Sequence, residues 1–242
     1  MAERHIYHHR DLQLHGVLER PAEPNGCAIL VVHEAPGLGD NARRRTRMLA
    51  DLGYLALAAD LYGGGRTFDG TEAMDALRAD TAIFRDRIRA GLDALAAVSG
   101  APPEQLAAIG YCFGGLAVLE LARTGAPLAA VISFHGLLRT PEPAQPGRVG
   151  AKILACTGAR DPLVPLDDVD AFSREMDAAG ADWQLVVYGR ALHSFTNRNV
   201  AGGADPRMDY HPSADRQSWA AALLFLQEAF TGSAEGVPNG RD

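Results

Sequence analysis

Short apolar runs alternate with longer stretches of helical periodicity from residue 27 to the end of the chain, and this alternation limits the possible folds most strongly. The short runs are rich in Val, Ile, Leu and Ala and are bounded by Gly, Pro, Asp or His, which is typical of buried strands. They span Cys27–Val32, Tyr54–Ala59, Leu106–Ile109, Ala130–Phe134, Ile153–Thr157 and Gln184–Tyr188. The helical periodicity covers Asn41–Leu52, Thr71–Val98, Gly114–Arg123, Leu166–Ala179 and Ala214–Phe230.

Strands that alternate with helices imply βαβ crossovers, so we predict an α/β fold with a mostly parallel sheet covered by helices on both faces. Upstream, Ile6–Tyr7 and Leu12–Leu18 alternate apolar and polar residues, which predicts an antiparallel hairpin at one edge of the sheet. No boundary separates two hydrophobic cores, so residues 1–230 are expected to form a single domain. Residues 231–242 have little to bury, and a disordered tail is expected there.

Composition and the N-terminal sequence limit which partners the chain can bind and where in the cell it is expected. Thirty acidic residues against 23 basic ones give a net charge of -7, and no Lys/Arg block is present, which argues against nucleic-acid binding. The N-terminus lacks the apolar core of a signal peptide, and no apolar run approaches the ~20 residues that span a bilayer. The three cysteines are odd in number and form no C-x-x-C pair, as expected for reduced thiols. We therefore predict a cytoplasmic monomer or homodimer with a small-molecule ligand and no membrane partner.

The segment Gly110–Gly115, GYCFGG, follows a predicted strand and opens a predicted helix. It matches the nucleophile-elbow pattern G-x-S-x-G, with Cys112 in place of the serine. Glycines are needed on both sides of the nucleophile because the strand-to-helix turn leaves no room for side chains. The helix N-terminus behind Cys112 favours thiolate over thiol. A buried structural cysteine in a glycine-rich turn is the alternative, but the pattern favours a nucleophile.

Chain order selects the partners of this nucleophile, because an acid and then a histidine follow the nucleophile in this type of site. Asp161 and His193 each come after a later predicted strand, and the carboxyl ends of parallel strands share one edge of a sheet. We therefore predict that His193 takes the proton of Cys112, and that Asp161 orients the imidazole and stabilises its charged form.

Two other histidines, His135 and His211, also follow Cys112 in the chain. His135 precedes every candidate acid, and His211 lies in a polar segment typical of an exposed loop. Asp161 by itself is better explained as a turn-forming aspartate before a proline. The order of the three residues, each at the end of a different strand, favours the catalytic interpretation.

The loop after the first buried strand carries Glu34, Ala35 and Pro36. In this type of site that loop supplies one N–H group of the oxyanion hole, and the residue after the nucleophile supplies the other. We predict Ala35 and Phe113 as the two donors, since Pro36 has no N–H group. From the residues alone, Glu34 is as well explained as a solvated loop carboxylate.

These segments together resemble the dienelactone hydrolase family of α/β-hydrolases, from about residue 10 to about residue 230. The likeness rests on residues 33–38 (HEAPGL), 60–62 (DLY), 110–115 (GYCFGG), 158–161 (GARD) and 193–197 (HSFTN). The resemblance implies an α/β-hydrolase fold, a triad of Cys112, His193 and Asp161, and a Glu34 that holds the resting thiol and accepts its proton. The reaction it implies is the opening of a dienelactone ring to maleylacetate.

One departure from the family pattern concerns the substrate carboxylate, which arginines hold in dienelactone-cleaving members. One of these arginines stands four residues after the catalytic histidine, where this chain has Asn197, with Arg198 next to it. The other belongs to the segment after residues 60–62, where Arg66 and Arg78 are both candidates. We take Arg198 and Arg78 as the predicted substrate-binding residues.

The sequence thus predicts a hydrolase without cofactor or metal that cleaves an ester or lactone through an acyl-thioenzyme. Four histidines near the N-terminus suggest a metal site, but no Cys or carboxylate completes a familiar ligand spacing. Two other functions stay open. One is a carboxylesterase or thioesterase for uncharged substrates, and the other is a non-catalytic relative that binds a ligand or senses redox state through Cys112.

Overall fold

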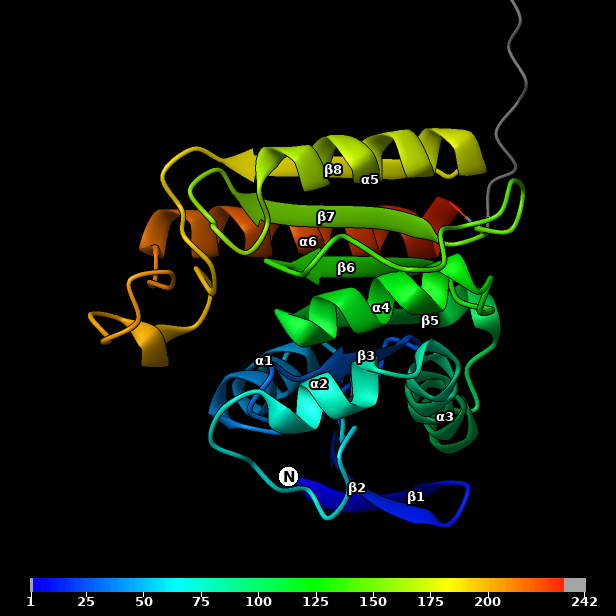
Figure 1. Cartoon of the computed structure of the whole chain (residues 1–242). Coiled ribbons are helices and arrows are strands. Elements are labelled where there is room, and N and C mark those ends of the chain that lie inside the picture. The colour runs from blue at the N-terminus through cyan, green and yellow to red at the C-terminus, as the bar shows by residue number, and fades with distance from the viewer. Residues whose placement is uncertain (1, 233–242) are drawn as a thin grey trace, which may run out of the picture.

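A single eight-stranded sheet runs through the molecule in the computed structural model, which describes residues 2–232 (Figure 1). The strand order is β1-β2-β4-β3-β5-β6-β7-β8. The strands are β1 (Glu3–His9), β2 (Leu12–Glu19), β3 (Ala28–Val32), β4 (Leu55–Ala59), β5 (Leu106–Tyr111), β6 (Ala130–Phe134), β7 (Lys152–Gly158) and β8 (Trp183–Tyr188). The helices are α1 (Asp40–Ala50), α2 (Glu72–Arg78), α3 (Thr81–Ser99), α4 (Phe113–Arg123), α5 (Leu166–Ala179) and α6 (Pro212–Gly232), with short 3₁₀ turns η1 (Pro103–Gln105) and η2 (Arg198–Val200).

Strands β3 to β8 are parallel, while β1 and β2 form an antiparallel hairpin that joins the sheet through β4. The predicted α/β class, the mostly parallel sheet and the antiparallel N-terminal edge are therefore confirmed. Strand β3 lies in the middle of the sheet between β4 and β5, and all five of its residues are buried. That burial explains why β3 has a continuous apolar sequence rather than an alternating one.

Two hydrophobic cores lie on opposite faces of the sheet. One is formed with α2, α3, α4 and α5, which lie in front of the sheet in Figure 1, and the other with α1 and α6, which lie behind it. Alternate residues of each central strand contribute to the two cores, as Leu30 and Val31 of β3 do. Helices on both faces therefore bury the central strands β3, β5 and β6.

The predicted helix over Thr71–Val98 is wrong in one respect, since it consists of two helices, α2 and α3. The break lies at Asp80, which has an extended backbone and caps α3 by accepting a hydrogen bond from the N–H of Ile83. An Asp side chain competes for backbone N–H groups in this way, and that favours a helix start over a helix interior. The break leaves α2 as a separate helix, whose Met74 and Leu77 share a hydrophobic core with Leu61 after β4.

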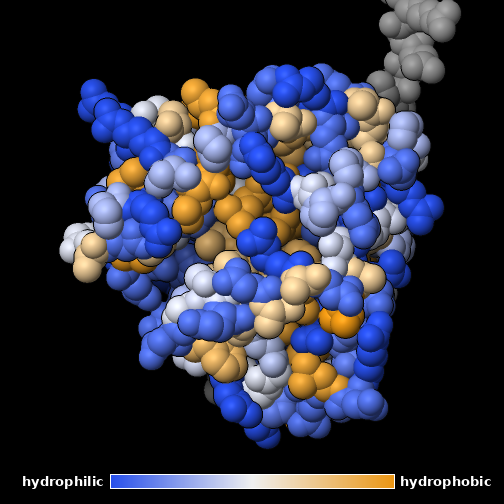
Figure 2. Space-filling view, viewed as in Figure 1, coloured by the Kyte–Doolittle hydropathy of each residue, from blue (hydrophilic) through white to orange (hydrophobic). Residues whose placement is uncertain are grey.

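Helix α6 continues to Gly232, two residues past the predicted domain end, and residues 233–242 of the predicted tail lie outside the described residues. Within residues 2–232, no helix combines the length and apolarity required to cross a bilayer. Figure 2 shows one face of the molecule, on which hydrophobic side chains gather near the centre and hydrophilic side chains surround them. The large exposed apolar residues are scattered over the fold: Ile6, Leu52, Phe68, Leu166, Val187 and Leu224.

Candidate active site

Cys112 occupies a sharp turn between β5 and α4, with φ 54° and ψ -115°. A non-glycine residue with positive φ is strained and needs support from its surroundings. A Cβ atom at Gly110 would lie 1.9 Å from the carbonyl oxygen of Gly114, and one at Gly114 would lie 2.3 Å from that of Val32. The predicted reason for glycines on both sides of Cys112 is therefore met in the structure.

His193 links Cys112 to Asp161 through its two ring nitrogens. The Nδ1 atom of His193 is 2.7 Å from Oδ2 of Asp161, and the Nε2 atom is 3.1 Å from Sγ of Cys112. Asp161 accepts a second hydrogen bond, from the N–H of Leu163, at its other oxygen. Because a carboxylate only accepts, Nδ1 of His193 carries a proton and Nε2 is the atom available to the sulfur. The structure thus brings the three residues predicted from chain order into contact.

The electrostatics of this trio favour a charged imidazole. Burial opposes protonation of His193, but the Cys112 sulfur and the Asp161 carboxylate outweigh burial and raise the pKa of His193 to about 10. A raised pKa means that the imidazolium is the stable form at neutral pH and is lost only as the pH rises through about 10. The N-terminus of α4, directly behind Cys112, favours negative charge on the sulfur. The geometry therefore suits a thiolate and imidazolium pair.

Glu34 follows β3 and lies beside this trio, with its carboxylate held by two amides. The Nδ2 atom of Asn197 donates to both carboxylate oxygens at 3.0 and 2.9 Å, and Nδ2 of Asn41 lies 3.4 Å from Oε1. Burial raises the pKa of Glu34, and the hydrogen bonds from Asn197 act in the opposite direction. The thiol of Cys112 is hydrogen-bonded to His193, whereas the family resemblance implies a resting thiol held by Glu34.

The peptide unit between Glu34 and Ala35 is fixed from behind by His33. The Nδ1 atom of His33 donates to the carbonyl of Glu34 at 2.7 Å, and its Nε2 atom accepts from the N–H of Leu61 at 3.2 Å. Burial lowers the pKa of His33, so the ring stays neutral with its proton on Nδ1. The N–H of Ala35 belongs to this same peptide plane and points away from the carbonyl. His33, a residue that sequence reasoning passed over, thus sets the direction of a predicted oxyanion donor.

The second predicted donor is the N–H of Phe113, the first residue of α4, where helix geometry leaves an N–H without a partner inside the helix. Tyr62 covers this region: its ring stacks on Phe113 at 6.0 Å, and its hydroxyl donates to the carbonyl of Ala35 at 2.9 Å. Burial and the nearby Cys112 raise the pKa of Tyr62, so the hydroxyl keeps its proton. Tyr62 therefore contacts both residues that supply the predicted donors, Phe113 through its ring and Ala35 through its carbonyl.

The loop that carries Tyr62 is built around Asp60, a fully buried carboxylate at the end of β4. Its two oxygens accept hydrogen bonds from four backbone N–H groups, those of His15, Tyr62, Gly63 and Gly65, at 2.7 to 3.0 Å. A buried charge is tolerated when it is saturated with donors in this way. We refer to Asp60 and these four N–H groups as the Asp60 cradle.

Comparison with known proteins gives this arrangement a family. Residues 14–230 match the sequence profile described as the Dienelactone hydrolase family, which covers most of the chain. This chain belongs to the dienelactone hydrolase family. The resemblance drawn from the sequence is confirmed, and membership places the chain among hydrolases of ester or lactone bonds.

Three proteins similar to this dienelactone hydrolase family member show how far the likeness extends along the chain. The solved structure of the dienelactone hydrolase-like promiscuous phosphotriesterase P91 from metagenomic libraries superposes with a TM-score of 0.87 at 36% identity, over 95% of this chain and 98% of that one. An uncharacterised protein of Caenorhabditis elegans is 40% identical over 150 residues, which is 61% of this chain and 94% of the relative. A protein of Escherichia coli (strain K12) with the provisional name carboxymethylenebutenolidase is 28% identical, over 86% of this chain and 80% of that protein. The α/β-hydrolase fold is thus confirmed.

Both arginines predicted to bind substrate, Arg198 and Arg78, lie on the surface of this dienelactone hydrolase family member. Arg198 is exposed beside Asn197, with its guanidinium carbon 5.9 Å from the ring centre of Tyr210. Arg78 is exposed on α2. A third arginine, Arg44, was not predicted; it is half-buried on α1 and donates to Asn41 at 2.9 Å. Burial lowers the pKa of Arg44, and the charges of Arg45 and Arg198 lower it further.

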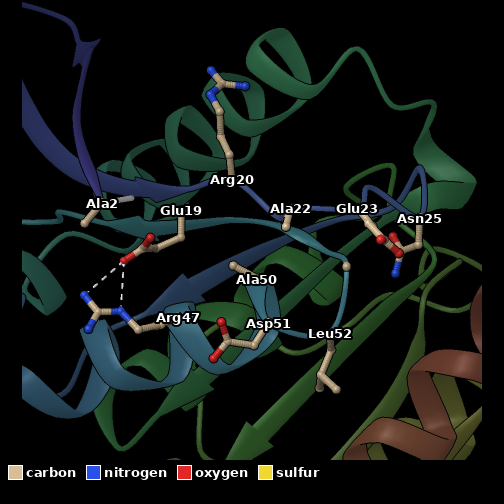
Figure 3. A pocket seen from close by; sticks show the side chains of 11 residues that line it. Ala2, Glu19, Arg20, Ala22, Glu23, Asn25, Arg47, Ala50, Asp51 and Leu52 are labelled. Atoms are coloured by element: carbon tan, nitrogen blue, oxygen red, sulfur yellow. Dashed lines mark hydrogen bonds and ion pairs between the residues drawn. The ribbon is translucent and has the colours of Figure 1, made fainter.

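Two surface pockets lie at different places relative to the candidate site. A pocket of about 840 Å³ lies at the amino ends of the parallel strands and contains the ion pair of Glu19 with Arg47 (Figure 3). A smaller pocket of about 320 Å³ lies one turn along α4 from Cys112 and is lined by Arg78, Phe84 and Leu116, among others. Phe84 stacks on Phe113 at 5.1 Å, which connects this smaller pocket to the predicted oxyanion region.

The N-terminal histidines, His5, His8, His9 and His15, do not form a metal site with one another. Within residues 2–232, no group of three or more His, Cys, Asp or Glu side chains is placed to hold a metal ion. His9, one of the four, instead accepts a hydrogen bond from Arg87 at its Nδ1 atom. His211 accepts from the N–H of Ala214 and so supports the first turn of α6.

Proposed function

We propose that the chain hydrolyses a carboxylic ester or lactone through an acyl-thioenzyme on Cys112. The observation that carries the proposal is the hydrogen-bonded series from Asp161 through His193 to Cys112, with Cys112 held at positive φ at the N-terminus of a helix. A thiolate is a strong nucleophile, and its formation needs a neighbouring base. The reducing setting expected for such an enzyme is the cytoplasm, in keeping with three free cysteines.

In the acylation half of the proposed reaction, the Cys112 thiolate attacks the acyl carbon and forms the carbon–sulfur bond. The carbonyl oxygen becomes an oxyanion, which accepts hydrogen bonds from the N–H groups of Phe113 and Ala35. The imidazolium of His193 then gives its proton to the departing alkoxide as the carbon–oxygen bond breaks. In a lactone, that alkoxide stays attached to the acyl group, so the product of this half-reaction is a ring-opened acyl-thioenzyme.

In the deacylation half, neutral His193 takes a proton from water, and the resulting hydroxide attacks the thioester carbon. The same N–H groups stabilise the second oxyanion. The carbon–sulfur bond breaks, the carboxylic acid leaves, and the thiolate and imidazolium pair is restored. Asp161 holds the imidazole in one tautomer through both halves and stabilises its positive charge.

Trapping the intermediate tests the proposal directly. The enzyme is mixed with a p-nitrophenyl ester, quenched in acid within milliseconds, digested and analysed by mass spectrometry. We expect a burst of p-nitrophenol and the acyl group on the peptide that contains Cys112. An aryl phosphotriester belongs in the same panel, because the relative P91 is described as a promiscuous phosphotriesterase. Turnover with the acyl group on a different residue would contradict the proposal.

The charge of the substrate separates the dienelactone reaction from a general carboxylesterase or thioesterase. If the natural substrate is an anion, Arg198 or Arg78 is expected to bind its carboxylate. Replacing that arginine by alanine should then raise KM for anionic substrates about tenfold, the loss of one charge-assisted hydrogen bond, and leave KM for neutral esters unchanged. Arg20→Ala is the control, because Arg20 lies at the amino ends of the parallel strands, away from Cys112. Equal KM values in all three variants would indicate an uncharged substrate.

Glu34 is proposed to regulate the proton on Cys112 through its charge. An ionised carboxylate opposes formation of a thiolate beside it, and burial raises the pKa of Glu34, so this opposition develops at a higher pH than for an ordinary glutamate. We expect Glu34→Gln to keep its fold and to shift the pH profile of Cys112 alkylation by iodoacetamide about one unit lower, equivalent to roughly 1.4 kcal/mol. Superimposable alkylation profiles would show that Glu34 has no such role.

A non-catalytic relative that senses redox state through Cys112 remains the alternative from a different class. It predicts no turnover over a broad ester panel together with fast oxidation of Cys112 by peroxide. The pairing of His193 with both Cys112 and Asp161 favours the enzyme, because a redox-sensing thiolate needs no acid behind its histidine.

A further inference from the structure

A second buried histidine, His135, lies directly behind the predicted catalytic trio. It follows β6, has no exposed surface and adopts φ 41°, a conformation that a non-glycine side chain takes only when its surroundings hold it. Chain order excluded His135 as the base, and the mechanism above does not use it. Its ring packs edge-on against His193, with 5.4 Å between ring centres.

Both ring nitrogens of His135 are used, and they connect two separate segments of the site. The Nδ1 atom is 3.1 Å from the backbone nitrogen of Cys112, and the Nε2 atom is 2.8 Å from Oγ1 of Thr196. The first contact is to the turn that carries the nucleophile. The second is to the loop that carries His193. His135 therefore spans the two segments whose separation determines the distance from Sγ to His193.

The proton on His135 can be placed from these contacts. A backbone N–H can only donate, so Nδ1 must accept from Cys112, and the single proton of a neutral imidazole lies on Nε2 and is donated to Thr196. Burial, the positive charge on His193 and the guanidinium of Arg45 hold the pKa of His135 well below its ordinary value. The remaining ring contacts are uncharged side chains, Tyr111 and Phe195. A neutral ring keeps Nδ1 free to accept from the N–H of Cys112.

Thr196 is itself held from the other side. Its carbonyl oxygen accepts hydrogen bonds from Arg45 at 3.3 Å and from Arg44 at 3.4 Å. The backbone N–H of Cys112 has one further acceptor, the carbonyl of Phe134 at 3.0 Å. The support therefore runs without interruption from α1 through Thr196 and His135 to the elbow.

We propose that His135 is a positioning residue that holds the Cys112 turn and the His193 loop in register, and so fixes the distance from the Cys112 sulfur to the His193 imidazole. The inference rests on the proposed function, because it assumes that this distance matters for reaction. A displacement of about 1 Å between reacting groups can cost a factor of about 100 in rate. A residue that joins both segments through one rigid ring is suited to prevent such a displacement.

Four variants of the full-length enzyme, three at His135 and one at Thr196, separate the two contacts. His135→Asn keeps an acceptor near the position of Nδ1 and loses the reach to Thr196, whereas His135→Gln reaches Thr196 and loses the acceptor for Cys112. His135→Phe removes both contacts and keeps the ring volume. Thr196→Val interrupts the same link while leaving His135 in place. His9→Asn is the matched control, since His9 is also buried and hydrogen-bonded through Nδ1 but lies on β1.

Two readouts are used: kcat and KM for a p-nitrophenyl ester, and the rate of Cys112 alkylation across pH. We expect His135→Phe to lower kcat about 100-fold with KM within about threefold of wild type, and to slow alkylation at neutral pH, because the thiolate loses its counter-ion. His135→Asn, His135→Gln and Thr196→Val should each lie between wild type and His135→Phe. His9→Asn should match the wild type in both readouts.

The inference is overturned if folded His135→Phe retains wild-type kcat and alkylation, or if activity falls only in proportion to the folded fraction measured by circular dichroism. Should His135→Phe fail to fold, wild-type kinetics in both Thr196→Val and His135→Gln overturn it equally. Failure of the proposed function has a different signature: the acyl group is trapped away from Cys112. In that case the alkylation profiles still report whether His135 holds the thiolate beside His193.

Discussion

Cys112→Ala is expected to reduce ester hydrolysis by a factor on the order of 10⁴ or more, to the level that substrate binding and the oxyanion hole alone can sustain. The reason is that alanine leaves no atom to form the acyl bond, while His193 and Asp161 stay in place. Alanine also fits the elbow sterically, since it is smaller than cysteine at the same Cβ. The measurement is kcat/KM with p-nitrophenyl esters and with a dienelactone.

The other two cysteines provide matched controls for this prediction. Cys156 is buried in β7, and burial raises its pKa to about 12, so it stays protonated. Cys27 is half-buried just before β3, and burial also raises its pKa. Cys156→Ala and Cys27→Ala are therefore expected to keep wild-type kcat/KM and rapid alkylation of the enzyme. Activity above about one per cent in Cys112→Ala would remove this residue from the mechanism.

The largest effect on stability is expected at the buried ion pair between Arg45 on α1 and Asp215 on α6. Both side chains are almost inaccessible, at 2% and 5% exposure, and the guanidinium carbon lies 4.8 Å from the ring centre of Trp219. Asp215→Ala leaves a buried guanidinium without its counter-ion, which costs about 3 to 5 kcal/mol in the free energy of unfolding. Chemical denaturation of wild type and variant measures the difference.

Two further variants show whether that loss comes from the unpaired charge. Arg45→Met combined with Asp215→Leu removes both charges and is expected to recover most of the free energy of unfolding, because an apolar pair avoids desolvation. Asp93→Ala breaks the exposed pair with Arg89 on α3 and should change the free energy of unfolding by less than about 1 kcal/mol. A double variant as unstable as Asp215→Ala would show that packing, rather than charge, is responsible.

Much of the fold could be predicted because the buried parallel strands have continuous apolar sequences with clear boundaries. The strand Ala130–Phe134 and the helix Leu166–Ala179 have the bounds predicted for them. The division of the residues 71–98 helix was missed because its apolar period continues across the break, and only the capping contact of Asp80 ends one helix and starts the next. Periodicity reports which face is buried, not whether the backbone is continuous.

The candidate site was predictable where chain order and turn geometry constrain it, as for Cys112, Asp161 and His193. The side chains that support these residues were not. The sequence marks Asn197 only as the residue at the position of an expected arginine, but in the structure its amide donates to both carboxylate oxygens of Glu34. Arg44 comes from a helix on the other side of the sheet from α4, and no spacing in the sequence connects it to residue 196. Such contacts depend on how helices pack, which a single sequence does not specify.

The Asp60 cradle has a consequence for how new specificities could arise in this scaffold. Its hydrogen bonds hold the backbone from Tyr62 to Gly65 without using the side chains that come after it. The stretch from Arg66 to Arg78, which includes α2 and part of the smaller pocket, is therefore attached to a fixed point independent of its own sequence. Libraries randomised over the exposed positions of that stretch, with the core residues Met74 and Leu77 kept, should yield folded enzymes with altered substrate range, since the reacting groups lie on other segments of the chain.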